Sequence, residues 1–152
     1  MKKNATAFWD ASALVPLCVK ESTSREAAAY LQQFSPAVWW GSIVEIHSAI
    51  CRLCREGMIT DAGKKEVVAR LEKLNRTWRE ISAGDSLRVL ALEMLGNYPL
   101  KAADSLQLAA SLVWCEQRPA RRTFVCSDKR LSEVARSIGF TVLELSHEPL
   151  KK

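Results

Sequence analysis

The chain has 152 residues, the length of one ordinary domain that can bury a substantial core. It carries 22 Lys and Arg against 17 Asp and Glu, and this formal charge of +5 favours polyanionic partners. Its uncharged stretches are too short to span a bilayer, and no signal-length apolar core follows Met1-Lys2-Lys3, so we expect a cytoplasmic protein. Five cysteines without the spacing of a disulfide framework indicate reduced thiols.

The hydrophobic pattern predicts strands that alternate with helices. A buried strand ends at Asp10, and a helix follows from Ser12 to about Glu21. The later elements are a helix from 24 that ends at Pro36, a strand over 37–41, helices over 42–57 and 60–78, a short strand over 79–82, helices over 87–97 and 101–117, a strand over 122–126, a helix over 129–138 and a strand over 141–145. Strands separated by helices require a mainly parallel sheet with helices on both faces, so we expect a single α/β domain over residues 1–152.

Four acidic residues lie where these predicted elements end or begin. Asp10 ends the first strand, and Asp128 follows the strand over 122–126. Glu45 and Asp104 each lie in the first turn of a helix. Because ligands bind outside the carboxyl ends of parallel strands, we expect these four carboxylates to meet at one edge of the sheet.

Each of these acids also has a purely structural interpretation. Ser42-x-x-Glu45 matches a capping box, Asp104 lies at the positive end of a helix, and Asp10 and Asp128 are suitable N-caps. Four carboxylates at one place repel one another unless a cation neutralises them, which argues against four independent caps. Oxygen ligands suit Mg²⁺ or Mn²⁺, and either ion activates water for phosphodiester hydrolysis.

A zinc site is a competing interpretation for another segment. His47, Cys51 and Cys54 form an i, i+4, i+7 row on one predicted helix. Ile43 and Ile50 lie on the same stripe, and no fourth ligand is evident. We therefore favour packing of these thiols in the core over zinc binding.

Four segments of the chain resemble the successive motifs of PIN-domain ribonucleases. These segments are Phe8-Trp9-Asp10-Ala11-Ser12-Ala13-Leu14, the stretch from Ser42 to Ala49 around Glu45, Ala103-Asp104-Ser105-Leu106-Gln107-Leu108-Ala109, and Cys126-Ser127-Asp128-Lys129-Arg130-Leu131. The resemblance spans nearly the whole chain, and the length is most similar to VapC-type toxins of toxin–antitoxin pairs. It implies a PIN-like three-layer α/β/α sandwich and an endoribonuclease that uses Mg²⁺ or Mn²⁺ to cleave single-stranded or structured RNA.

The same resemblance implies roles for individual residues. The catalytic and metal-binding residues would be Asp10, Glu45, Asp104 and Asp128. Ser12 would support Asp10. Where the family often has Thr this chain has Cys126, so a hydroxyl contact of the pocket is either missing or supplied by Ser127. Trp9 is bulkier than the usual aliphatic residue, which affects packing rather than chemistry.

Two further polar residues are expected to lie outside the acidic site or to play no part in its chemistry. Asp85 lies in Gly84-Asp85-Ser86, which we interpret as a helix cap rather than as part of the acidic site. Lys101 lies near Asp104, and we interpret it as a solvated residue of the first helical turn rather than as an RNA contact.

The resemblance also implies partners, namely a cognate antitoxin that presents Arg or Lys to the acidic pocket and a second copy of the chain in a homodimer. The apolar residues that we expect at the dimer contact are Tyr30, Leu31, Phe34, Met58 and Ile59. Two alternatives remain open. One is a PIN-like interaction module that no longer cleaves RNA, and the other is a phosphatase or small-molecule hydrolase, although no nucleophile motif supports it.

Overall fold

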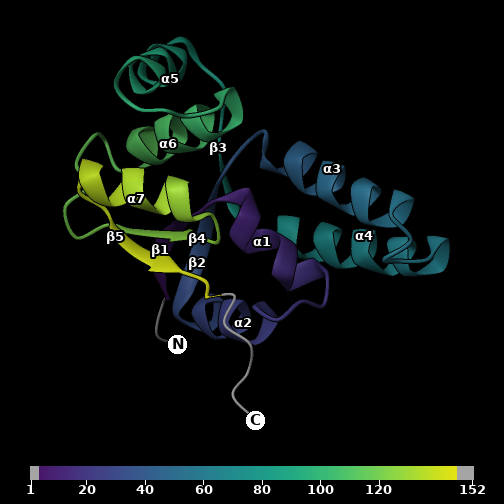
Figure 1. Cartoon of the computed structure of the whole chain (residues 1–152). Helices are drawn as coiled ribbons and strands as arrows, with labels where there is room; N and C mark the ends of the chain where they lie inside the picture. Colours follow the sequence, from purple (N-terminus) through teal and green to yellow (C-terminus); the bar gives the residue numbers. More distant parts are fainter. Residues whose placement is uncertain (1–3, 147–152) are drawn as a thin grey trace.

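Five parallel strands form the centre of the molecule in the computed structural model, which describes residues 4–146 (Figure 1). The strands are β1 (Ala5–Trp9), β2 (Phe34–Trp39), β3 (Arg79–Ile81), β4 (Thr123–Cys126) and β5 (Thr141–Glu144). Their order across the sheet is β3-β2-β1-β4-β5, and every neighbouring pair is parallel. The carboxyl ends of all five strands therefore face one edge of the sheet, with β1 in the middle.

Two layers of helices cover the sheet. In the described residues the helices are α1 (Ala11–Cys18), α2 (Ser24–Gln33), α3 (Ser42–Arg55), α4 (Asp61–Asn75), α5 (Asp85–Asn97), α6 (Ala102–Trp114) and α7 (Lys129–Ile138). α5, α6 and α7 pack on one face, whereas α1 to α4 pack on the other, and α3 and α4 extend outward as a pair (Figure 1). The predicted α/β/α sandwich with a parallel sheet is confirmed.

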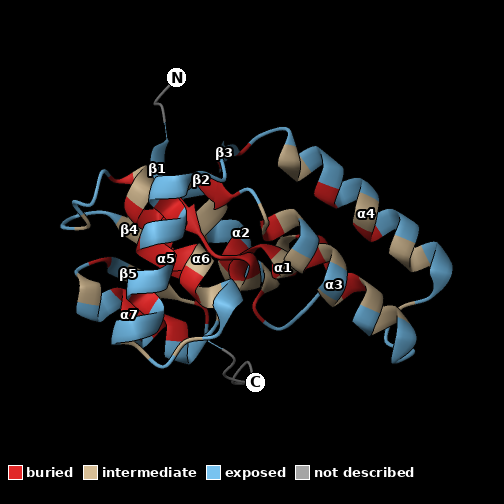
Figure 2. Cartoon of the chain, turned by 90° about the horizontal axis from the view of Figure 1, so that it is seen from above, coloured by how far each residue is buried: buried red, intermediate tan, exposed pale blue. Residues whose placement is uncertain are grey.

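Alternation along the strands separates two hydrophobic cores. In β1, Phe8 packs with the core under α5, α6 and α7, whereas Ala7 and Trp9 pack with the core under α1 to α4. In β4, Phe124 and Val125 divide in the same way. Successive side chains of a strand point to opposite faces, so a strand covered on both faces is apolar throughout. Figure 2 shows this buried centre in red, with exposed residues on the outer surfaces of the helices.

The start of β2 differs from the sequence prediction. We expected Pro36 to end the preceding helix, with a strand only from residue 37 onward. Instead α2 ends at Gln33, and β2 begins at Phe34 with Pro36 inside it. β3 pairs with Ala37–Trp39 only, so β2 has an open side at Pro36. A strand with an open side tolerates a residue that lacks an N–H group.

Other elements end earlier than predicted. α1 ends at Cys18 rather than near Glu21. α6 ends at Trp114 rather than near Gln117, because Glu116 and Gln117 adopt positive φ angles that a helix does not contain. No helix in the described range 4–146 is long and apolar enough to cross a membrane.

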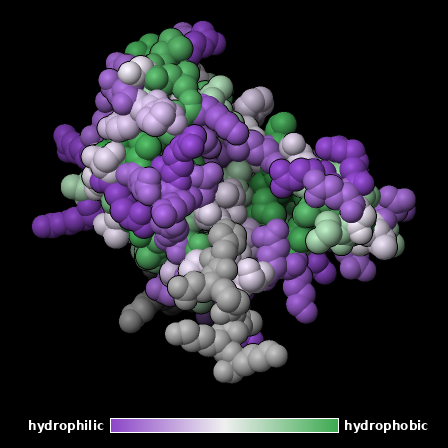
Figure 3. All heavy atoms as spheres, viewed as in Figure 1, coloured by the Kyte–Doolittle hydropathy of each residue, from purple (hydrophilic) through white to green (hydrophobic). Residues whose placement is uncertain are grey.

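Most of the apolar residues expected at a dimer contact are not exposed. Tyr30, Leu31, Phe34 and Ile59 are half-buried and pack against the core under α1 to α4, whereas Met58 is exposed. The expected exposure of these four residues is wrong, because α2 and the α3–α4 connection partly bury them against the sheet layer, whereas Met58 is exposed as expected. The dimer contact itself stays a prediction. The larger exposed apolar stripe lies on α5, with Val89, Leu92 and Leu95, and hydrophobic atoms show over this helix at the top of Figure 3.

Candidate active site

Asp10 is held at the junction of β1 and α1. Its backbone N–H donates to the carbonyl oxygen of Val125 in β4, at 3.0 Å, so the junction is tied to the neighbouring strand. Its carboxylate accepts from the Ser12 N–H at 3.0 Å and from the Ser12 hydroxyl, and it is the N-cap of α1. Only 4% of Asp10 is exposed. The capping interpretation is correct for Asp10, and the cap fixes its carboxylate beside the end of β4.

Asp128 has the equivalent position after β4. Its carboxylate accepts from the Leu131 N–H at 2.9 Å and caps α7. Between the two caps lies Cys126, whose Sγ is 3.3 Å from the Asp128 nitrogen and 3.9 Å from Asp10 Oδ2. The Ser12 hydroxyl, which donates to Asp10, accepts from the Ser127 N–H at 3.0 Å. The structure therefore joins the two strand ends through Ser12, and it places a thiol at the position where the resemblance implies a hydroxyl.

Glu45 is oriented by a different element from the one that the sequence suggested. The N-cap of α3 is Gly41 and makes no side-chain capping bond, so the predicted capping box does not form. The buried Ser42 hydroxyl and Glu45 Oε1 instead accept from Gln107 Nε2 of α6, at 2.8 and 3.0 Å. Sequence reasoning missed Gln107. Its signal was a large amide side chain three positions after Asp104, in a helix whose other buried residues are apolar or small.

Three of the four predicted acids line one cleft of about 1000 Å³. They are Glu45, Asp104 and Asp128. An adjoining hollow of about 440 Å³ is lined by Ser12 and Ser127, and it shares Glu45, Ala49, Arg52 and Asp128 with the cleft. Asp10 lies beneath this surface, bonded to Ser12. We call the two joined spaces the acidic cleft.

Burial and crowding shift the pKa values of these carboxyl groups. Desolvation by burial raises the pKa of Asp10 to about 6, and the charges of Asp104 and Asp128 act in the same direction against the hydrogen bonds from Ser12. Desolvation also raises the pKa of Glu45 to about 7, with a contribution from Asp10. The pKa of Asp104 is raised by burial and by Asp128. The expected electrostatic cost of bringing the acids together is therefore present.

The donor chemistry of the acidic cleft fits Mg²⁺ or Mn²⁺. The donors are carboxylate and hydroxyl oxygens, and none of the ion pairs within residues 4–146 involves one of the four acids. In the same range, no three His, Cys, Asp or Glu side chains are already arranged to hold a metal ion. The chemistry of a cation site is present without a preformed ligand geometry, and metal binding remains a prediction.

Cations that sequence reasoning missed line the same cleft. Arg52 of α3 and Arg130 of α7 belong to its wall, together with Lys101. Lys101 is exposed as expected, but it also borders the cleft and lowers the pKa of Asp104, as does Arg130. Arg52 follows Glu45 by seven positions, which places both on one side of α3, and this spacing was the available signal. The acidic centre therefore has a basic rim.

The remaining candidates lie outside the acidic cleft. Cys54 donates to Asp61 at 3.5 Å, and with His47 and Cys51 it forms no metal-holding group in the described part of the chain. Asp85 opens α5 and pairs with Arg88 at 3.5 Å on the surface. Asp85 is not the N-cap that the sequence suggested, because the N-cap is Gly84.

Solved structures share the parallel α/β/α sandwich of this protein. A chain in a toxin–antitoxin complex from Klebsiella pneumoniae superposes with a TM-score of 0.61 at 15% identity, covering 85% of this chain and 92% of that chain. A chain in the crystal structure of FitAcB from Neisseria gonorrhoeae gives 0.62 at 13% identity, covering 94% and 100%. No protein-family model and no curated protein matches the sequence. These similarities establish the PIN-like fold.

Proposed function

We propose that the protein is a metal-dependent endoribonuclease that cleaves single-stranded or structured RNA. The observation that carries this proposal is that acids from four distant segments gather at or directly beneath one cleft, and that no ion pair among residues 4–146 involves any of them. The residues that would hold the metal are Asp10, Glu45, Asp104 and Asp128. Bound Mg²⁺ or Mn²⁺ supplies an activated water and stabilises the leaving oxygen of a phosphodiester.

The protein's own residues orient this acidic centre and attract the substrate. Ser12 holds the Asp10 carboxylate, and Gln107 holds that of Glu45. Arg52, Lys101 and Arg130 on the rim attract phosphates without regard to sequence, in line with the formal charge of +5. The choice of RNA as the substrate rests on the motifs that resemble those of PIN-domain ribonucleases.

We infer that this nuclease is the toxin component of a type II toxin–antitoxin pair. Support comes from the fold shared with a chain of the Klebsiella pneumoniae toxin–antitoxin complex. A carboxylate cluster without its metal is a strong acceptor for a guanidinium, so an antitoxin segment with Arg or Lys suits the acidic cleft. A small protein encoded beside this chain should then co-purify with it and inhibit cleavage, and replacing its cleft-bound Arg or Lys by Ala should restore cleavage. If no neighbouring protein inhibits, the assignment as a toxin fails while the nuclease proposal stands.

Cleavage of a labelled unstructured RNA with Mn²⁺ or Mg²⁺ tests the proposed activity. We expect EDTA to stop cleavage, and Asp104→Asn or Asp128→Asn to reduce the rate roughly 100-fold or more, since a metal contributes several kcal/mol of transition-state stabilisation. Asn remains a good N-cap, so Asp128→Asn should keep α7 intact. Asp85→Asn is the matched control and should cleave normally.

A catalytically inactive interaction module is the second candidate function. It is favoured by one observation, the lack of a preformed metal-holding group in the described residues. Thermal unfolding distinguishes the two, because a metal that binds only the folded state raises the melting temperature. Millimolar Mn²⁺ should stabilise the wild type and not Asp128→Asn. A folded wild type that is neither stabilised by Mn²⁺ nor able to cleave RNA would support the interaction module.

A further inference from the structure

Trp40 occupies an unusual position for a large aromatic residue. It directly follows β2, at the carboxyl edge of the sheet, and precedes the N-cap Gly41 of α3. It is 56% exposed, whereas every other Phe, Trp and Tyr within residues 4–146 is buried or half-buried. Most of this side chain is left uncovered by the fold, and the proposed chemistry of the acidic cleft does not use it.

The local structure holds Trp40 outward. Its backbone N–H donates to the carbonyl oxygen of Ile81 at 3.0 Å. Its ring contacts the ring of the buried Trp39 edge-on, with 6.2 Å between the ring centroids. A Cβ at Gly41 would lie 2.5 Å from Trp39 Nε1, so the inner side of this junction is already filled by the Trp39 indole. A Trp side chain has only two χ angles, so its ordering on a ligand costs little conformational entropy.

Trp40 precedes Val44 by four positions and is not itself one of the residues that line the acidic cleft. Val44 and Glu45, in the first turn of α3, both line the cleft, and Val44 is 66% exposed. Lys101 and Arg130 belong to the same cleft. Val44 thus gives the cleft an exposed apolar wall beside its basic rim, and the exposed Trp40 comes four positions earlier, at the same edge of the sheet. An aromatic ring and cations at one edge suit an unpaired nucleotide, whose base stacks while its phosphate pairs with a cation.

We propose that Trp40 stacks against an unpaired base of the RNA whose phosphates lie along Lys101 and Arg130, so that the acidic cleft takes single strands in preference to duplexes. The proposal rests on the proposed ribonuclease function and names the substrate form for the same site. A duplex hides the faces of its bases and gives Trp40 nothing to stack on.

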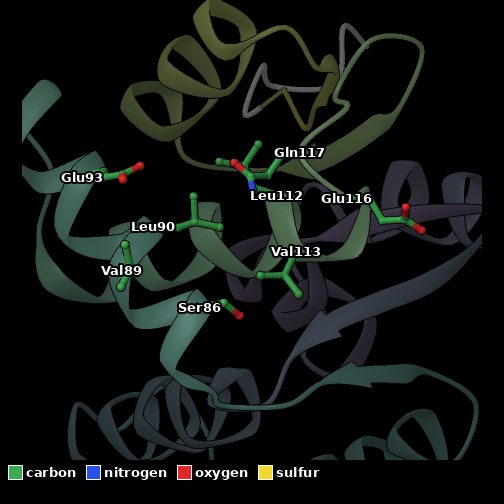
Figure 4. A pocket seen from close by; sticks show the side chains of 8 residues that line it. All are labelled: Ser86, Val89, Leu90, Glu93, Leu112, Val113, Glu116 and Gln117. Atoms are coloured by element: carbon green, nitrogen blue, oxygen red, sulfur yellow. The ribbon is translucent and has the colours of Figure 1, made fainter.

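Another groove on the molecule has apolar walls but is unsuited to RNA. It has a volume of about 450 Å³ and lies between α5 and α6, with apolar walls that include Leu90 and Val113 (Figure 4). Glu93 and Glu116 belong to its lining, and their charges repel phosphates. Met58, after α3, is an exposed apolar residue like Trp40 and lines no part of the acidic cleft, so Met58→Ala is the matched control.

RNA binding in EDTA, measured by fluorescence anisotropy, tests the stacking separately from cleavage. The probes are a short unstructured RNA and the same sequence as a duplex. We expect Trp40→Ala to weaken single-strand binding roughly tenfold with an unchanged salt dependence, since stacking on an aromatic side chain is not ionic. Trp40→Phe should retain most of the affinity and Met58→Ala all of it, whereas Arg130→Gln should lower the salt dependence instead.

The outcomes separate this inference from the function on which it rests. If the wild type cleaves RNA with Mn²⁺ and Trp40→Ala still binds the single strand normally, the stacking role is overturned and the nuclease stands. An equal loss of duplex and single-strand binding overturns it as well. If Trp40→Ala keeps RNA binding but no longer captures the protein encoded beside this chain, the residue belongs to a protein interface. A folded wild type that neither binds nor cleaves RNA removes both proposals.

Discussion

Asp10 and Asp128 cap helices and also belong to the acidic centre. Asp10 accepts from the Ser12 N–H, and Asp128 accepts from the Leu131 N–H, as ordinary N-caps do. The same bonds hold both carboxylates near Asp104, and the charge of Asp128 raises the pKa of Asp10 and of Asp104. The structural and functional interpretations of these acids are therefore compatible. Replacement by Asn, which still caps a helix, removes the charge and leaves the cap.

The raised pKa values make metal-free stability depend on pH. Folding raises the pKa of Asp10 from 3.8 to about 6 and that of Glu45 from 4.5 to about 7, so the folded state binds more protons than the unfolded state between these values. The free energy of unfolding in EDTA should therefore fall as the pH rises from about 4 to about 7, and stay low above. Asp10→Asn should be more stable than the wild type by about 1 to 3 kcal/mol near pH 8 and similar to it near pH 3.

Urea denaturation in EDTA over this pH range measures the effect. Asp85→Asn, at an exposed position on α5, is the control and should follow the wild-type curve. A wild-type stability that rises between about pH 4 and 7, or an Asp10→Asn variant that is less stable near pH 8, would contradict the burial of a charged Asp10.

Gln107 acts on the site through Glu45. Its hydrogen bond lowers the pKa of Glu45, against the larger effect of burial. Gln107→Leu should therefore raise that pKa further and move the acid limb of the cleavage pH profile to higher pH, besides costing about 1 to 3 kcal/mol of stability for the unpaired Ser42. Ser111→Ala, in the same buried helix with a hydroxyl bonded to Leu108, is the control for stability alone. An unmoved acid limb would mean that Gln107 only supports the fold.

At the scale of elements, the β2–α3 junction sets the position of Glu45 and Trp40. Gly41 allows α3 to start directly against the Trp39 indole, where an added Cβ would lie 2.5 Å from Nε1. Gly41→Ala should therefore destabilise the protein by about 1 to 3 kcal/mol through overpacking. Gly96 lies inside α5 with nothing within 4 Å of an added Cβ, so Gly96→Ala should instead stabilise by about 0.5 to 1 kcal/mol.

Thermal melts of the two glycine variants measure this contrast. Cleavage of RNA is the second measurement for Gly41→Ala, because a shifted start of α3 moves Glu45 as well. Equal melting temperatures for Gly41→Ala and the wild type would show that the Trp39 ring can shift with little loss of stability, and that the junction is not tightly packed.

At the scale of the whole molecule, the apolar stripe on α5 favours association of two chains. Val89, Leu92 and Leu95 recur every three residues and are 54%, 63% and 40% exposed. Exposed apolar patches of this kind mark contacts, and two-fold dimers are the commonest oligomers. α5 belongs to the helical layer opposite α1 and α3, and it contributes no residue to the acidic cleft. We therefore propose a homodimer that uses α5.

Light scattering at micromolar concentration tests the homodimer. We expect twice the 17.0 kDa of the chain for the wild type and 17.0 kDa for Leu92→Glu, because a buried charge without a partner disrupts an apolar contact. Met58→Glu, at another exposed apolar residue, should leave the dimer intact. A wild-type mass of 17.0 kDa would overturn the proposed homodimer.

Local patterns in the sequence were enough to predict the layered architecture. The alternation of apolar runs with helical segments required a parallel sheet, and a parallel sheet brings Asp10 and Asp128 to one edge whatever the details of packing. The bounds of α7 and the N-cap at Asp128 were also predictable, since a cap, a helical period and the terminal Gly139 lie within a dozen residues. These features depend on interactions between residues close in the chain.

Tertiary packing decided what each polar residue of the site contacts. Gln107 and Glu45 are 62 positions apart, and only the packing of α6 beside α3 supplies the hydrogen-bond partner that the buried glutamine needs. Pro36 enters β2 because β3 is too short to pair with it, which no pattern within β2 reveals. The basic rim and the exposure of Trp40 likewise depend on which faces other elements leave uncovered. Such contacts follow from shape and burial in three dimensions, so a linear pattern of residue types does not contain them.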